Sequence, residues 1–156
     1  MSKIAFYELS QCILSYHDWM KVDGLWDLLP NYQKNLTDKE HWKIIIDTWS
    51  KSEHNSQTQN REKWIDILTM REPINFFKKN LNQNIKIYRA GSEDGFSWTL
   101  KKEIALEFQH RYNNIVNPIY FSLDHKTVNI IDKEIKYDDV KFYNNLRGED
   151  EIVIIP

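Results

Sequence analysis

The spacing of the apolar residues changes near the middle of the chain. Up to about residue 82 they recur at helical intervals, as Trp42, Ile45 and Trp49 do, whereas after residue 83 they form short alternating or continuous runs typical of strands. A helical half followed by a strand half indicates an α+β fold. We therefore predict one domain over residues 1–156, with a helical part at 1–82 and a β-rich part at 83–156.

Local signals subdivide the helical part. Thr37 and Glu40 form a capping box, in which each side chain satisfies a backbone donor at the start of a helix. Gly24 and Pro30 are expected to break helical structure, leaving only a short apolar segment between them. The pattern predicts helices at 4–20, from about 37 onwards, at 61–70 and at 74–81, with a polar loop at 54–60.

The second half is expected to alternate between strands and one helix. Residues 85–89 alternate in polarity before Gly91, which predicts a first strand. Apolar residues from Leu100 to Tyr112 recur at helical spacing and predict a helix. Further strands are expected at 118–123, at 127–131 and from 152 onwards, while the segment 138–143 fits no single pattern.

Two polar pieces near the first strand are candidates for a functional site. Arg89 ends that strand, and its permanent planar cation suits a phosphate or carboxylate, although a surface ion pair is the simpler role. Thr99 suits the cap of the following helix, while the Ser97 hydroxyl could orient a neighbouring carboxylate. Either piece alone is common in proteins of many kinds.

Glu149 and Glu151 form a third piece, just before the last strand. In an extended segment residues two apart point to the same side, so we expect the two carboxylates on one face. Such a pair can stabilise an oxocarbenium-like centre while one member positions a hydroxyl or takes a proton. The alternative is a solvated acidic turn.

Taken in order, Arg89, Ser97-Trp98-Thr99 and Glu149-Asp150-Glu151 resemble the motifs of the mono-ADP-ribosyltransferase fold of the Arg-Ser-Glu class. That family has an Arg at the end of its first core strand, a Ser-x-Ser or Ser-x-Thr element on its second, and a Glu-x-Glu or Gln-x-Glu motif further on. The segments 88–91, 95–99 and 105–108 are also similar to small bacterial or phage-related members. The resemblance implies a mixed or antiparallel sheet core of that fold, from about residue 83 onwards.

The resemblance further implies that NAD is the substrate, that nicotinamide is released, and that ADP-ribose passes to a macromolecular acceptor. A protein arginine is favoured as the acceptor over nucleic acid. Glu151 would be the catalytic residue, Ser97 would orient it, and Glu149 would recognise the arginine. The residues implied to contact NAD are Arg89 at the phosphates, the backbone beside Ala90 at the carboxamide, Ser97, Trp98 and Thr99 of the second motif, and Phe108 against the nicotinamide ring.

Two other functions stay open. An NAD glycohydrolase would use nearly the same site, with water as the acceptor. A protein that has lost catalysis could instead use the aromatic-rich helical half to bind and block a partner. The presence of Arg89, Ser97, Glu149 and Glu151 together favours the enzyme, because a binding protein has no need of that set.

Composition argues against several other classes of protein. A formal charge of −2 does not suit a protein that mainly grips nucleic acid, and four Gly without a P-loop pattern do not suit an NTPase. The five His are scattered, so no metal centre is expected. The single cysteine, Cys12, cannot form an internal disulfide, and no run is apolar enough for a signal peptide or a membrane span. A cytoplasmic location is therefore expected, in a host cell if the protein is a toxin or phage effector.

Overall fold

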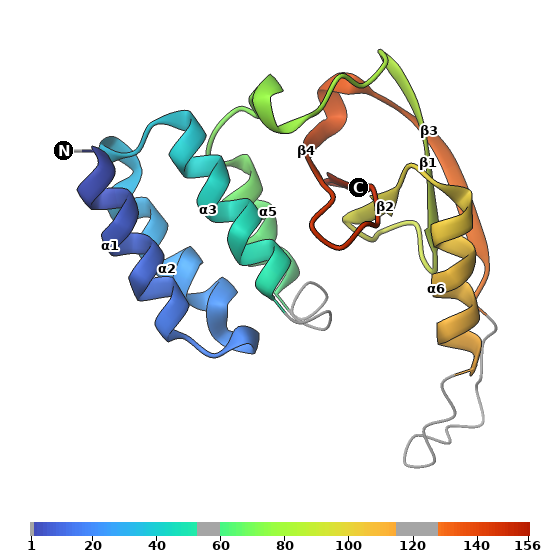
Figure 1. Cartoon of the computed structure of the whole chain (residues 1–156), viewed down its shortest axis with the longest axis horizontal. Coiled ribbons are helices and arrows are strands. Elements are labelled where there is room, and N and C mark those ends of the chain that lie inside the picture. The colour runs from blue at the N-terminus through green and yellow to red at the C-terminus, as the bar shows by residue number, and fades with distance from the viewer. Residues whose placement is uncertain (1, 53–59, 115–127) are drawn as a thin grey trace. The chain divides into compact units, whose positions relative to one another are not determined.

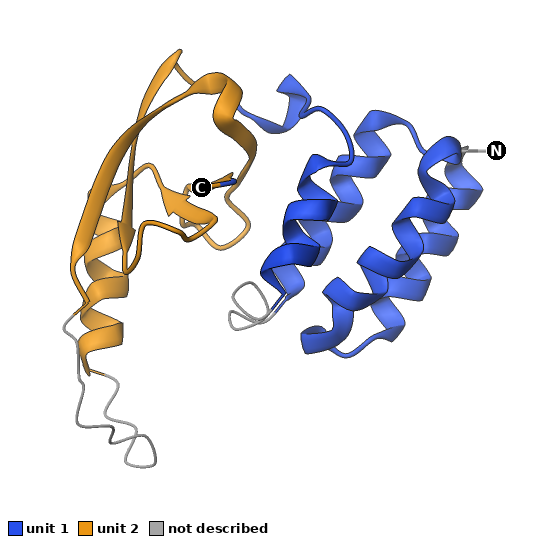
Figure 2. Ribbon diagram, turned by 180° about the vertical axis from the view of Figure 1, so that it is seen from behind, with its two compact units in different colours: residues 1–79, 155 blue, residues 80–154, 156 orange. Residues whose placement is uncertain are grey.

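The computed structural model describes residues 2–52, 60–114 and 128–156 (Figure 1). The chain forms two compact units, one spanning Met1–Lys79 with Ile155 and one spanning Asn80–Ile154 with Pro156 (Figure 2). The first unit is helical and the second carries the sheet and one helix. The predicted α+β class is therefore confirmed.

The third helix of the helical unit starts at the capping box that the sequence predicts. The Thr37 side chain accepts a hydrogen bond from the backbone of Glu40, and the Glu40 carboxylate accepts one from the backbone of Thr37, which completes the capping box. The helices of this unit are α1 (Ser2–Ser15), α2 (Lys21–Tyr32), α3 (Asp38–Lys51) and α5 (Arg61–Thr69), with 3-10 turns η1 (Asp18–Met20), η2 (Gln33–Asn35) and η3 (Asn75–Phe77). The predicted loop at 54–60 lies almost wholly outside the described residues.

Three predictions in this unit are wrong. Gly24 and Pro30 do not break the chain but lie inside α2. A Cβ at position 24 would lie 2.8 Å from Cε2 of Tyr16, so Gly24 is required by the close approach of an aromatic ring and not by a turn. Pro30 has no N–H to donate to a carbonyl of the preceding turn, but only two residues of α2 follow it, so the helix ends soon after it. The short helix predicted at 74–81 is only the single turn η3.

The core of the helical unit is built on the predicted aromatic stripe of α3. Trp42 is fully buried and its indole N–H donates to the carbonyl of Glu72 at 2.9 Å. The rings of Trp49 and Trp64 meet edge to face, with centroids 4.8 Å apart. Aromatic pairs of this kind add to the apolar burial that holds α3 against α5.

A histidine is buried in the same core. His41 lies on α3, is fully buried, and neither of its ring nitrogens has a hydrogen-bond partner in the part of the chain that the structure describes. Burial, helped by the charge of Arg71, lowers the pKa of His41 to about 4. The neutral ring is therefore the form that the fold accommodates.

This burial predicts acid-sensitive stability. Between pH 6.5 and about 4 the unfolded chain binds a proton at His41 that the folded chain does not, so stability should fall by about 3 kcal/mol as the pH drops through that window. Denaturant unfolding between pH 7.5 and 4.5 measures this loss. The His41→Leu variant should lose that part of the slope, and His110→Gln, at an exposed histidine on another helix, should keep it. An unchanged slope in His41→Leu would assign the acid sensitivity to other groups.

The sheet of the second unit is antiparallel throughout the described residues. Its order is β3-β1-β2-β5-β4. The helix α6 packs against β1, β2 and β3, as Figure 1 shows. The elements are β1 (Asn84–Ala90), β2 (Ser97–Thr99), α6 (Lys102–Asn114), β3 (Ile130–Lys136), η4 (Tyr137–Asp139), β4 (Val140–Asn144) and β5 (Glu151–Ile154).

The first and last predicted strands and the predicted helix are confirmed as β1, β5 and α6. The predicted strand at 118–123 lies outside the described residues. The strand predicted at 127–131 is misplaced, because β3 starts at Ile130 and continues through charged residues to Lys136. Pairing with β1 along its whole length explains this extension, since Asn84 lies opposite Lys136 and Ala90 opposite Ile130. The ambiguous segment 138–143 forms the end of η4 and most of β4.

Candidate active site

The pairing of β2 with β5 brings Ser97 and Glu151 together. Thr99 lies directly opposite Glu151 in this antiparallel pair, so Ser97, two residues from Thr99, shares its face of the sheet. The Ser97 hydroxyl donates a hydrogen bond of 2.5 Å to Oε1 of Glu151. Residues that the sequence offered in two separate motifs are thus in direct contact.

A third residue holds the other oxygen of the same carboxylate. Asn144, at the end of β4, lies directly opposite Glu151 across the β4–β5 pair and is buried. Its side-chain N–H donates to Oε2 of Glu151 at 3.0 Å. Sequence reasoning missed Asn144, because only the strand register shows that a residue seven positions earlier faces Glu151.

Arg89 is joined to this pair through the backbone of Ser97. Its Nη1 donates to the Ser97 carbonyl at 2.5 Å, and its Nε donates to the Ser92 carbonyl at 3.0 Å. Burial lowers the pKa of Arg89 from its ordinary value, yet a guanidinium stays charged in proteins. Both of these hydrogen bonds go to carbonyl oxygens, and the negative charge of Asp94 favours the charged form of the guanidinium.

Gly95 provides the space that the Arg89 side chain occupies. A Cβ at position 95 would lie only 2.0 Å from Cζ of Arg89. Any side chain at this position would therefore displace the guanidinium. This glycine lies in the segment between β1 and β2, and its absent side chain fixes where Arg89 can lie.

The acidic motif is not extended as predicted. Glu149 lies in a bend, Asp150 has a left-handed φ of 45°, and β5 begins only at Glu151. The prediction that Glu149 and Glu151 project from one extended strand is therefore wrong. Asp is among the few residues that adopt the left-handed region readily, which allows the turn at this position.

Asp150 is buried and anchors the turn. Its Oδ1 accepts a hydrogen bond from the Tyr143 hydroxyl, and its Oδ2 forms an ion pair with Nζ of Lys101 at 2.5 Å. Burial and this hydrogen bond raise the pKa of Tyr143 to about 12, so the phenol remains a donor. The backbone N–H of Asp150 donates to Oδ1 of Asn145 at 2.9 Å. These contacts hold the turn between Glu149 and Glu151.

Trp98 and Thr99 serve the structure of the motif. Trp98 points to the opposite face from Ser97, is 2% exposed within the apolar core, and donates its indole N–H to the Gly95 carbonyl at 2.7 Å. The Thr99 hydroxyl donates to the Glu149 carbonyl at 2.7 Å and accepts from the Lys101 N–H at 3.1 Å. The geometry therefore gives Trp98 and Thr99 packing and bracing roles. Ala90 is buried in the β1–β3 ladder.

Glu149 and part of α6 lie in the same electrostatic neighbourhood. Burial raises the pKa of Glu149, and the charge of Glu151 raises it further, while Arg147 and Arg111 oppose this shift. Burial also raises the pKa of Tyr112, and the charge of Arg89 opposes that shift. Carboxylates, a tyrosine and a partly buried arginine thus influence one another across the site.

The helix α6 adds an aromatic face to this neighbourhood. The Phe108 and Tyr112 rings stack with centroids 6.1 Å apart, and Cζ of Arg111 lies 5.2 Å from the centroid of Phe108. Phe108 was a predicted contact of the nicotinamide. Tyr112 was predicted only as an apolar position of the helix. Residues four apart on a helix are neighbours, so its spacing from Phe108 could have placed the two rings side by side.

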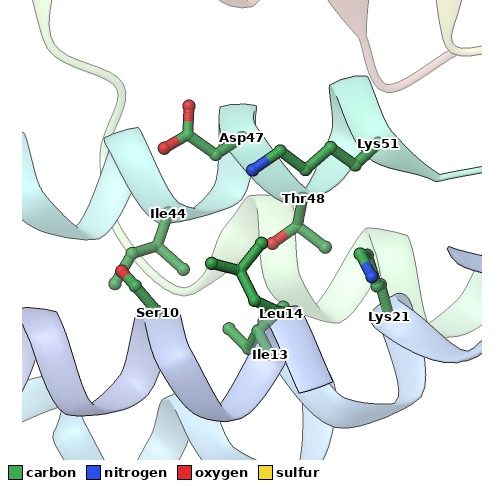
Figure 3. Close-up of a pocket in the computed structure, with 8 residues that line it drawn as sticks. All are labelled: Ser10, Ile13, Leu14, Lys21, Ile44, Asp47, Thr48 and Lys51. Carbon is green, nitrogen blue, oxygen red and sulfur yellow. The ribbon is translucent and has the colours of Figure 1, made fainter. Parts of the chain in front are cut away.

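The helical unit has a small pocket of its own (Figure 3). Its volume of about 70 Å³ is far below the roughly 300 Å³ at which small-molecule sites begin, so it does not suit a dinucleotide. None of the predicted site residues lines it. The pocket is lined by Ser10, Ile13, Leu14, Lys21, Ile44, Asp47, Thr48 and Lys51.

The described ranges 2–52, 60–114 and 128–156 contain neither a metal-binding cluster nor a membrane-spanning helix. No group of three or more His, Cys, Asp or Glu in these ranges is arranged to hold a metal ion. No helix in them combines the length and apolar character needed to cross a membrane.

The chain was also compared with known proteins. Searches against models of protein families, curated proteins and solved structures gave no match. The functional conclusion therefore rests on the side chains that the sheet brings together.

Proposed function

We propose that this chain is an NAD-dependent mono-ADP-ribosyltransferase that releases nicotinamide and transfers ADP-ribose to a protein arginine. The observation that carries the proposal is the Ser97–Glu151 hydrogen bond, made across β2 and β5 with Arg89 bound to the same serine. A carboxylate fixed by its neighbours, together with a partly buried cation bound to the backbone of the same serine, is suited to an anionic substrate that develops positive charge as it reacts.

Each residue has a task in this reaction. Arg89 would bind the NAD pyrophosphate, since its fork of donors matches phosphate oxygens. Breaking the bond between the ribose and nicotinamide sends the bonding electrons to nicotinamide and leaves an oxocarbenium-like cation. Glu151 would bind a hydroxyl of that ribose and stabilise the cation electrostatically. The Phe108–Tyr112 face would contact the nicotinamide ring.

Glu149 would complete the transfer at the acceptor. An arginine nitrogen of the target protein attacks the cation, forms the new carbon–nitrogen bond, and loses a proton. A raised pKa brings the Glu149 carboxylate closer to the range in which it can accept that proton. Its pairing with the acceptor guanidinium would also orient the attacking nitrogen.

Two rival functions differ from the proposed transferase in measurable ways. A glycohydrolase would release nicotinamide with water as the acceptor, so it would leave no ADP-ribose on protein. An inactive binding protein would neither release nicotinamide nor require Arg89 near Glu151. Incubation with adenine-labelled NAD, with and without a cell lysate, separates all three by nicotinamide release and by label on macromolecules.

The acceptor role of Glu149 gives a sharper test. Glu149→Gln should lower ADP-ribose transfer to agmatine, a small guanidine acceptor, by about tenfold, because the guanidinium loses its charged partner. Nicotinamide release without agmatine should stay within about threefold, since the cation is stabilised by Glu151. The control is Glu107→Gln, the same chemical change at an exposed position of α6. Equal loss of both reactions in Glu149→Gln would contradict the division of roles.

A further inference from the structure

Asn144 contacts Glu151 but has no role in the reaction proposed above. Its N–H binds Oε2 of Glu151 at 3.0 Å, while Ser97 binds Oε1 at 2.5 Å from the strand on the other side. A carboxylate held at one oxygen can still rotate about its last bond. Donors on both oxygens, from β4 and from β2, fix the plane of the group.

The orientation of the Asn144 amide follows from its second contact. Its Oδ1 accepts a hydrogen bond from the backbone N–H of Leu146 at 3.2 Å. Reversing the amide would place its NH2 group against that N–H and its oxygen against the carboxylate of Glu151. Both contacts would then be repulsive, so the arrangement with the N–H facing Glu151 is the one that both neighbours accept.

Asn144 also joins the carboxylate to the loop that carries Glu149. Leu146 lies in that loop, and the adjacent Asn145 accepts the N–H of Asp150 at the other end of it. The side chain of Asn145 is exposed, whereas Asn144 is buried. The two neighbouring asparagines thus brace the same loop, but of the two only Asn144 has a contact with Glu151.

We propose that Asn144 is a positioning residue for catalysis: it fixes the plane of the Glu151 carboxylate that the ribose of NAD meets, and it ties that plane to the loop bearing Glu149. This inference rests on the proposed function for its chemistry. A carboxylate has about four lone-pair directions, so two donors such as those of Ser97 and Asn144 can orient the group. Asn144 itself touches neither NAD nor the acceptor.

The variant Asn144→Asp tests this most directly. It keeps the size of the side chain and the acceptor for the Leu146 N–H, but it places a carboxylate oxygen against Glu151 in place of a donor. At pH 8 the repulsion should lower kcat for nicotinamide release roughly tenfold, since misplacing a reacting group by about 1 Å can cost up to about a hundredfold. KM for NAD should change less than threefold, because Arg89 is untouched.

The pH profile separates positioning from mere structural support. As the pH falls towards 5, a proton shared between Asp at position 144 and Glu151 restores a donor, so the ratio of variant to wild-type kcat should rise. Asn144→Ala should lower kcat without this recovery. Asn145→Asp makes the same chemical change one residue away and keeps the acceptor for Asp150, so its kcat and pH profile should match the wild type.

Three outcomes decide the matter. Wild-type kcat in both Asn144 variants of an active protein, or a loss in Asn144→Asp that is the same at every pH, overturns the positioning role. A wild-type protein that releases no nicotinamide overturns the proposed function instead. The side-chain amide NMR signals of Asn144 then test by themselves whether it holds the Glu151 carboxylate: a shift on Glu151→Gln supports that contact, and unchanged signals overturn it.

Discussion

Glu151→Gln should reduce nicotinamide release from NAD by roughly 10²–10³-fold, because the substitution removes the charge that would stabilise the developing cation. The glutamine side chain has nearly the same shape, but it offers one oxygen where Glu151 offers two. It can therefore accept from Ser97 or from Asn144, but not from both as the carboxylate does. Initial rates of nicotinamide release, measured at saturating NAD, give the loss directly.

The matched control for this substitution is again Glu107→Gln, which should keep the wild-type rate. The melting temperature of Glu151→Gln should stay within a few degrees of the wild type, since β5 retains its apolar core residues Ile152 and Ile154. If Glu151→Gln released nicotinamide at the wild-type rate, the catalytic assignment of Glu151 would be wrong even though the hydrogen bond with Ser97 exists.

Arg89→Gln should weaken the binding of NAD by about a hundredfold, because charge-assisted hydrogen bonds to phosphate are among the strongest that a side chain makes. Arg89→Lys keeps the charge without the planar fork and should weaken binding by about tenfold. Isothermal titration calorimetry in the Glu151→Gln background measures these affinities without consuming NAD. Binding at wild-type affinity in Arg89→Gln would place the phosphates elsewhere.

Gly95→Ala offers an independent check on the same guanidinium. Its Cβ would lie 2.0 Å from Cζ of Arg89, so the arginine must move although it is still present. NAD binding should weaken in the same direction as in Arg89→Lys. The control is Glu107→Gln, at an exposed position of α6, which should bind NAD as the wild type does.

The parts of the fold that the sequence predicted correctly depend on short-range signals. The capping box of Thr37 and Glu40 spans one helical turn, and the strand β1 is read from its own alternation. Gly24 was misjudged because its role is set by Tyr16, whose ring packs on it. β3 was misplaced because its charged residues take strand form only through pairing with β1.

The candidate site likewise contains residues that short motifs could indicate and residues that only the folded structure reveals. The order of the motifs could suggest Arg89, Ser97 and Glu151 as site residues. The family resemblance implied that these three motifs, which lie far apart in the chain, come together in the fold, and the sequence alone does not show this. Asn144 could not be found, since its importance lies in a strand register. The turn at Asp150 was also missed, because its φ of 45° is stabilised by Tyr143 of β4 and by Lys101, the residue just before α6.

The hydrogen bond between Ser97 and Glu151 spans 54 positions of the chain, whereas β4 and β5 are joined by a short loop. Contacts between distant positions form later in folding than local ones, because a longer loop must be closed before they are made. The β4–β5 hairpin, with Asn144 already opposite Glu151, can therefore form early, and β2 must reach it afterwards. A newly made chain would thus form its local structure before it assembles the proposed site, and a partly folded copy would lack the proposed activity.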